Sequence, residues 1–183
     1  MLIRYDQGGP SADTFDIPCI AAFVRHYLRA ATVSVDPFAR NKRWATHTND
    51  LSPDTNAEYH MDAEAFVHQL AEQGVEADCV LFDPPYSPRQ ISEVYQGIGR
   101  TPTMEDTQNA RLYARVRAAL MRIVPLGGVV LSFGWNSTGM GKGRGFEKVE
   151  VLIVNHGAAH NDTICVAERR VSLPLKLPLE LGA

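Results

Sequence analysis

The run Asp83-Pro84-Pro85-Tyr86 combines three groups that could hold an amino-substituted ring. The Asp83 carboxylate can accept a hydrogen bond from an exocyclic amine. The two prolines fix φ and restrict the residue before each of them, so the Pro84 carbonyl points in a set direction. The Tyr86 ring can stack on a base. The same residue types are common in turns, so the tetrad alone does not separate a catalytic site from the end of a strand.

Three short apolar runs end in acidic residues and predict where the tetrad lies. Residues 78–82 are predicted to form a buried strand that ends at Asp83, and residues 32–36 a strand that ends at Asp36. Residues 46–50 form a weaker candidate strand that ends at Asp50. Ligands of open α/β sheets bind beyond the carboxyl ends of the strands, so we expect the three acids to lie near one edge of a sheet.

The rest of the chain alternates between helical and extended patterns. Apolar residues at helical spacing predict helices over residues 19–31, 62–73 and 105–124, the first capped by Asp16. Further strands are predicted over residues 129–133, 148–155 and 163–168, the last two joined by a hairpin loop. This alternation predicts an α/β fold with a mainly parallel sheet and an antiparallel pair at its end.

In this order, the segments resemble the S-adenosylmethionine-dependent amino-methyltransferases, whose DPPY signature matches residues 83–86. The resemblance implies a Rossmann-like class I methyltransferase fold: a mainly parallel seven-stranded sheet with a C-terminal antiparallel hairpin. It also implies S-adenosylmethionine as cofactor and methylation of an exocyclic amine, adenine N6 or cytosine N4. The small size of the chain is similar to that of stand-alone adenine-specific DNA methyltransferases of phages and mobile elements.

The resemblance assigns roles residue by residue. Asp83, Pro84, Pro85 and Tyr86 would be catalytic. Asp36-Pro37-Phe38-Ala39 resembles the D-x-F-x-G cofactor motif, Asn49-Asp50 the acid that binds the ribose hydroxyls, and Asp62-Ala63 the acid that contacts the adenine amine of the cofactor. Two departures stand out. Arg40 follows Ala39 where the family has glycine, and only thirteen residues separate Asp36 from Asp50, so the helix between those strands must be short or absent.

Basic residues near the predicted edge are candidates for substrate contacts. Residues 87–104 form a candidate substrate loop that contains Arg89 and Arg100, although a short surface helix without contacts is the alternative. Lys142 and Arg144 lie in a glycine-rich run that could touch substrate phosphates or serve as a plain linker. A base inside a duplex cannot reach such a pocket, so the target would be flipped out and stacked on Tyr86.

Composition limits the remaining choices. The 183 residues are 45% hydrophobic, which predicts one globular domain over residues 1–183 without a separate target-recognition domain. No apolar run is long enough for a membrane span, and three widely spaced cysteines predict neither disulfides nor a metal site. We therefore expect no membrane partner, no metal and a location in the cytoplasm of a bacterial or phage-infected cell. The net charge of −3 gives no support to nucleic-acid binding.

Several functions stay open on the sequence alone. The first is methylation of adenine N6 in DNA, because cytosine N4 enzymes of the family more often carry serine in place of Asp83. The alternatives are a cytosine N4 methyltransferase and an RNA base methyltransferase acting on adenine or guanine. A non-catalytic cofactor-binding subunit that shapes the nucleic-acid surface of a partner is the third. A homodimer and a complex with a partner subunit are both open. The recognition sequence and the oligomeric state do not follow from the sequence.

Overall fold

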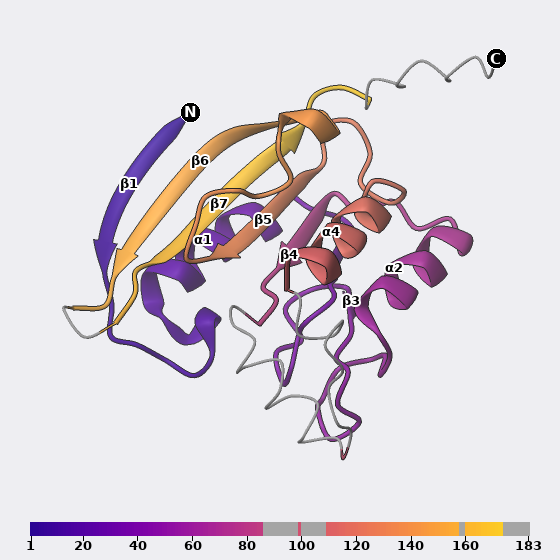
Figure 1. The fold of residues 1–183 in the computed structure, drawn as a ribbon, viewed down its shortest axis with the longest axis horizontal. Coiled ribbons are helices and arrows are strands. Elements are labelled where there is room, and N and C mark those ends of the chain that lie inside the picture. Colours follow the sequence, from indigo (N-terminus) through magenta and orange to yellow (C-terminus); the bar gives the residue numbers. More distant parts are fainter. Residues whose placement is uncertain (86–98, 100–108, 158–159, 174–183) are drawn as a thin grey trace.

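The computed structural model describes residues 1–85, 99, 109–157 and 160–173, which form one sheet with helices on both faces (Figure 1). Its strands are β1 (Leu2–Gln7), β2 (Ser34–Asp36), β3 (His47–Thr48), β4 (Cys79–Phe82), β5 (Val129–Gly134), β6 (Phe146–Asn155) and β7 (Thr163–Arg170). Its helices are α1 (Pro18–Leu28), α2 (Ala63–Glu72) and α4 (Asn109–Leu120), with short 3-10 turns η1 (Thr14–Asp16) and η2 (Lys142–Arg144).

The sheet has seven strands in the order β1-β6-β7-β5-β4-β2-β3. Strand β7 is antiparallel to both neighbours, and every other pair of adjacent strands is parallel. This arrangement confirms the expected mainly parallel sheet with an antiparallel C-terminal pair. It places β4, which precedes the tetrad, inside the sheet between β5 and β2.

Strand β1 was not predicted from the sequence. It pairs in parallel with β6 along its whole length, from Leu2 opposite Glu150 to Gln7 opposite Asn155. All six of its residues are exposed, and the alternation of apolar and polar residues over Ile3-Arg4-Tyr5-Asp6 is its one local signal of a strand. One of the seven strands therefore lies at an edge that the expected topology did not include.

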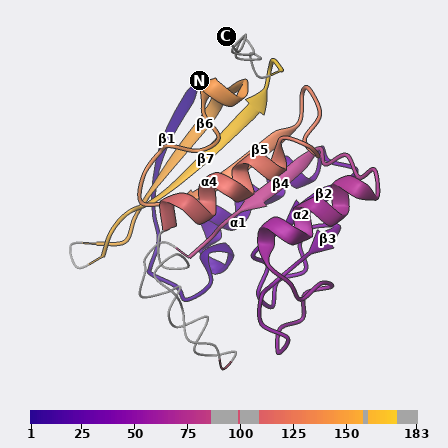
Figure 2. The same cartoon turned by 45° about the vertical axis from the view of Figure 1, so that its right-hand side comes forward.

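Two cores lie on opposite faces of the sheet. Val80 and Phe82 of β4 pack with α2 and α4 on one face, whereas Cys79 and Leu81 pack with α1 on the other. Figure 2 shows α2 and α4 together on one face, with α1 behind the sheet. Because β4 is buried on both faces, its sequence is continuously apolar, as in other parallel sheets.

The helix starts show where local sequence signals hold. Asp62 caps α2, a role that was not predicted, since its Oδ1 accepts hydrogen bonds from the backbone N–H of Glu64 and Ala65 at 2.9 and 3.1 Å. The expected cap of α1 by Asp16 is wrong, because Ile17 is the cap residue and makes no side-chain cap. Asp16 ends η1 instead, and its Oδ1 lies 2.5 Å from Lys42 Nζ.

The connection from β2 to β3 contains no helix in residues 37–46, all of which the structure describes. The chain turns back at once, with the Ala39 N–H donating to the Asn49 carbonyl at 2.8 Å and the Lys42 N–H to the Ala39 carbonyl at 2.8 Å. This agrees with the short separation of Asp36 and Asp50. Among the described residues, no helix has the length and apolar character of a membrane span.

Candidate active site

A pocket lies beyond the carboxyl ends of β2 and β4, the edge at which ligands bind in open α/β sheets. It contains Asp83, the first residue of the tetrad, and two residues of the predicted cofactor motif, Phe38 and Ala39. The full lining is Asp13, Thr14, Phe15, Phe38, Ala39, Arg40, Lys42 and Asp83. The structure therefore places Asp83 of the predicted catalytic tetrad beside Phe38 and Ala39 of the predicted cofactor motif.

Tyr113 of α4 contacts the tetrad. Pro84 is buried and Pro85 is half-buried, and the Pro85 carbonyl accepts a hydrogen bond from the hydroxyl of Tyr113. The Tyr113 ring packs edge-on against Phe82 with ring centres 6.2 Å apart. Burial raises the pKa of the Tyr113 phenol, so it remains a hydrogen-bond donor at neutral pH. Tyr86 lies outside the described residues, so its stacking role stays a prediction.

Asp36 is the most unusual polar group of the site. It is 1% exposed, and its Oδ1 accepts the Phe38 N–H at 3.0 Å. Its Oδ2 is buried without a hydrogen-bond partner in the described part of the chain. Burial raises the pKa of this carboxyl well above its usual range, and the negative charges of Asp83 and Asp50 add to the effect. A protonated Asp36 is a hydrogen-bond donor as well as an acceptor.

The second predicted cofactor segment, Asn49-Asp50, connects parts of the protein chain. Asn49 is 1% exposed, and its amide group donates to the carbonyls of Pro37 at 3.1 Å and Met61 at 3.0 Å. Its oxygen accepts the Met61 N–H at 3.1 Å. These bonds tie the loop after β2 to the segment before α2. Asp50 accepts the backbone N–H groups of Arg40 at 3.1 Å and Ser52 at 2.9 Å, so contacts with ribose hydroxyls stay a prediction.

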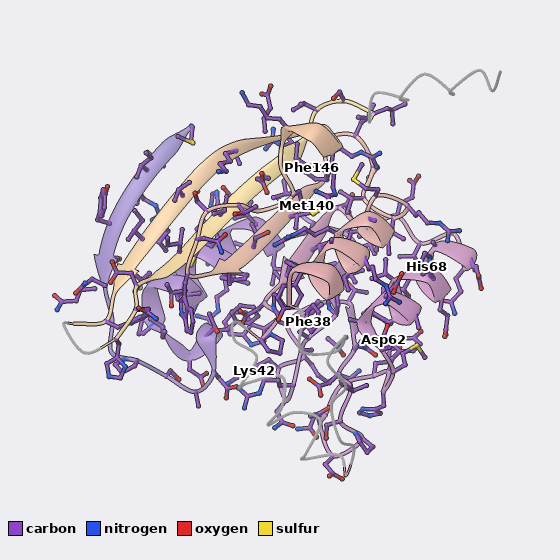
Figure 3. The ribbon with its side chains drawn as sticks, in the orientation of Figure 1. Phe38, Lys42, Asp62, His68, Met140 and Phe146 are labelled. Carbon is purple, nitrogen blue, oxygen red and sulfur yellow. The ribbon has the colours of Figure 1, made fainter. Side chains whose placement is uncertain are left out.

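Asp62 and Ala63 lie where α2 begins, at the same end of the sheet as Phe38 and Lys42 (Figure 3). Asp62 is exposed and uses Oδ1 for the helix cap. Ala63, the first residue of α2, is buried in the core that α2 and α4 share. The position agrees with a place on the rim of the site, whereas contact with an adenine amine remains untested.

The predicted substrate cations divide into two groups. Arg89, Arg100 and the loop 87–104 lie outside the described residues, apart from Gly99. Lys142 and Arg144 form η2, directly before β6. The first residue of β6, Phe146, pairs with Arg170, whose N–H bonds to Gly128 just before β5 begins. Figure 3 accordingly shows Met140 and Phe146 at the opposite end of the sheet from Phe38 and Lys42, so the structure does not bring η2 to Asp83.

Sequence reasoning missed the contribution of η1 to the pocket. Asp13, Thr14 and Phe15 face the loop after β2, although they precede it by more than twenty residues. In the sequence, Arg40 marks a departure from the motif, and Arg40, Lys42 and Arg43 form a basic cluster after the predicted strand 32–36. The contact between η1 and the loop after β2 depends on two ion pairs, Arg40 with Asp13 and Lys42 with Asp16. A single sequence does not specify such long-range pairs.

Comparison with known proteins relates the chain to others by structure alone. Its sequence matches no protein-family model and no curated protein. Among solved structures, it is similar to TrmN from Thermus thermophilus, with a TM-score of 0.55 and 14% identity over 85% of this chain and 49% of that one. NSun6 from Pyrococcus horikoshii, solved with the ligand SFG, gives a TM-score of 0.53 and 15% identity over 80% and 50% of the two chains.

A third similar structure is a protein from Streptococcus mutans assigned as a SAM-dependent methyltransferase. Its TM-score is 0.51, with 11% identity over 80% of this chain and 48% of that one. The chain thus spans about half the length of these proteins. The likeness shows that it has their Rossmann-like methyltransferase fold, and activity is a separate question.

Proposed function

We propose that this chain is an S-adenosylmethionine-dependent methyltransferase that acts on the exocyclic amine of a nucleic-acid base, with adenine N6 in DNA as the first candidate. One observation carries the proposal. Asp83-Pro84-Pro85 directly follows an inner strand of a methyltransferase-like sheet, and Asp83 shares a pocket with Phe38 and Ala39 of the cofactor motif.

The pocket residues fit this cofactor. S-adenosylmethionine supplies an electrophilic methyl group on a sulfonium, together with an ammonium, a carboxylate and an adenosine. The pocket offers carboxylates such as Asp13, cations such as Lys42 and the aromatic ring of Phe38. Behind it, the buried Oδ2 of Asp36 lacks a partner among the described residues, as expected of a group whose partner arrives with a ligand.

The chain's own residues can activate an aromatic amine. Such an amine is a poor nucleophile because its lone pair is delocalised into the ring. The Asp83 carboxylate and the Pro84 carbonyl would each accept one of its N–H groups, which favours a pyramidal nitrogen and stabilises the positive charge that develops there. The proton released afterwards leaves through Asp83 or water. Tyr113 supports this arrangement because its hydroxyl holds the neighbouring Pro85 carbonyl.

The experiment that tests the proposal combines the protein with labelled S-adenosylmethionine and, separately, duplex DNA, single-stranded DNA and RNA. Mass analysis of the digested nucleosides then names the product. N6-methyladenine in DNA supports the first candidate, whereas N4-methylcytosine or a methylated RNA base selects one of the alternatives. Cofactor binding without transfer to any substrate would indicate a non-catalytic subunit, and the absence of cofactor binding would refute the proposal.

A further inference from the structure

Arg40 has a backbone conformation that its residue type disfavours. Its φ is +50°, and it is the only residue other than glycine with a positive φ in the part of the chain that the structure describes. Glycine adopts this left-handed region freely, whereas a residue with a Cβ is strained there. Arg40 follows Ala39, at the position of the glycine in D-x-F-x-G. Arg40 thus has a positive φ, the backbone conformation that favours glycine, although it is an arginine.

The side chain of Arg40 makes contacts that a glycine could not make. Its Nη1 donates to the Ala12 carbonyl at 2.6 Å and lies 2.7 Å from Asp13 Oδ1. Two residues further along, Lys42 Nζ lies 2.5 Å from Asp16 Oδ1. Together, these contacts join the loop after β2 to both ends of the η1 region, and we refer to them as the Arg40 clasp. Strain at a site where side-chain contacts hold the backbone in place is a pointer to function.

Apolar contacts extend the same junction. The rings of Phe15 and Trp44 lie 5.6 Å apart, and the guanidinium of Arg25 lies 4.8 Å from the centre of the Trp44 ring. Phe15 also lines the pocket that contains Asp83. The clasp therefore holds a wall of the pocket, and Trp44 is a natural reporter of whether that wall is in place.

We propose that Arg40 is a positioning residue for the cofactor: it occupies the motif's glycine position and uses its side chain to hold the η1 turn against the cofactor pocket. This inference rests on the proposed function. A glycine at this position would have no side chain to contact Ala12 or Asp13. Here, the site would also depend on a contact between two segments of the chain that lie 27 residues apart, from Asp13 to Arg40.

The size of the effect follows from the exposure of the pair. The side chains of Arg40 and Asp13 are 57% and 32% exposed, so water and salt weaken their attraction and global stability should change little. The effect on the cofactor is larger because the loss of a charged hydrogen bond leaves the turn to be ordered upon binding. We expect Arg40→Gly, which removes the side chain and relieves the strained φ, to weaken cofactor binding about five- to tenfold.

Two measurements test the inference. Calorimetry gives the dissociation constant for S-adenosylmethionine in the wild type, Arg40→Gly, Asp13→Asn and the double variant. Hydrogen exchange of the backbone amides of residues 12–17 is measured on the cofactor-free proteins. Both single variants should weaken binding, the double variant should be no weaker than either, and exchange should speed up in all three. Restored binding in the charge-reversed pair Arg40→Asp with Asp13→Arg would give further support.

Arg4→Ala is the control, since it removes an ion pair with Glu150 at the far edge of the sheet, where the Arg4 and Glu150 side chains are 47% and 10% exposed. It should alter neither the cofactor affinity nor the exchange of residues 12–17. Wild-type affinity together with unchanged exchange in Arg40→Gly would overturn the inference. If the wild type itself bound no S-adenosylmethionine, the proposed function would fail, and the exchange of the cofactor-free proteins would still decide whether Arg40 holds η1.

Discussion

Two buried carboxylates, Asp36 and Glu168, organise loops at different places along the sheet. Both are 1% exposed. The oxygens of Glu168 on β7 accept the backbone N–H groups of Met140 and Gly141, which fixes the loop between β5 and β6. Asp36 at the end of β2 uses one oxygen for the Phe38 N–H, and its other oxygen has no partner among the described residues.

Glu168 has hydrogen-bond partners for both oxygens, as expected of a structural carboxylate, whereas Asp36 beside the candidate ligand site has a partner for only one among the described residues. A buried acceptor without a partner is costly, so native proteins keep few of them, and each needs an explanation. Both oxygens of Glu168 are paired by the loop that this carboxylate fixes. Asp36 lies next to the pocket and keeps an oxygen available.

The largest expected effect is at the catalytic end. Asp83→Ala removes the carboxylate that would accept the amine N–H, and we expect the rate of methyl transfer to fall by at least about 10²-fold to 10³-fold. Cofactor affinity should remain close to that of the wild type. Single-turnover methylation and calorimetry measure the two quantities. An Asp83→Ala protein with normal turnover would remove Asp83 from the mechanism.

At the structural carboxylate, Glu168→Ala should destabilise the protein by about 3 kcal/mol, because it leaves two N–H groups of a partly buried loop without an acceptor. Urea denaturation measures this loss of unfolding free energy. Glu168→Gln, which keeps an acceptor oxygen, should cost less. Weaker cofactor binding at full stability would contradict the structural assignment of Glu168.

The two acids should also differ in the pH dependence that they cause. The pKa of Asp36 is raised in the folded protein, so the folded state holds the proton more tightly and Asp36 favours folding at low pH. As the pH rises above the unfolded value of 3.8, the wild type should lose up to about 1.4 kcal/mol of unfolding free energy per pH unit relative to Asp36→Asn. The loss stops at the folded pKa. Parallel pH profiles for the two proteins would show that Asp36 is ionised when buried.

The smallest effect is expected at Tyr113. Tyr113→Phe keeps the ring that packs on Phe82 and removes only the hydrogen bond to the Pro85 carbonyl. Because one neutral hydrogen bond contributes about 1 kcal/mol, we expect kcat to fall about fivefold with KM and the melting temperature nearly unchanged. A fall in melting temperature with normal kcat would mean that Tyr113 only stabilises the fold.

Local patterns in the sequence predicted the elements that build the edge with the candidate active site. The apolar run of β4, the helical spacing of α2 and the acid at the end of β2 each act within a few residues, so their signals survive in a single sequence. Strand β1 was missed because its signal is short, an alternation over Ile3-Arg4-Tyr5-Asp6 whose residues all stay exposed. The cap by Asp16 is wrong because Ile17, one residue later, is the cap residue of α1, and the Asp16 carboxylate pairs with Lys42.

The positions of the basic residues were harder to predict. Lys142 and Arg144 follow β5 in the sequence, which suggested that they lie near its carboxyl end. The loop instead runs back along the sheet before β6 begins, held by Glu168, a contact between residues 27 and 28 positions apart. Arg40 and Lys42 illustrate the reverse case: they lie on the pocket, and their carboxylate partners come from a turn that no local pattern connects to them.

The pairing of β1 with β6 also bears on how the chain acquires its structure. The Arg4 side chain bonds to Glu150, 146 residues later, so β1 must wait until β6 has been synthesised. At about 5–20 residues per second on the ribosome, that wait lasts roughly 7–30 seconds. Until then, the apolar side chains of Leu2, Ile3 and Tyr5 have no strand beside them. Nascent chains would therefore expose an unpaired, aggregation-prone apolar segment, the kind of surface that molecular chaperones shield.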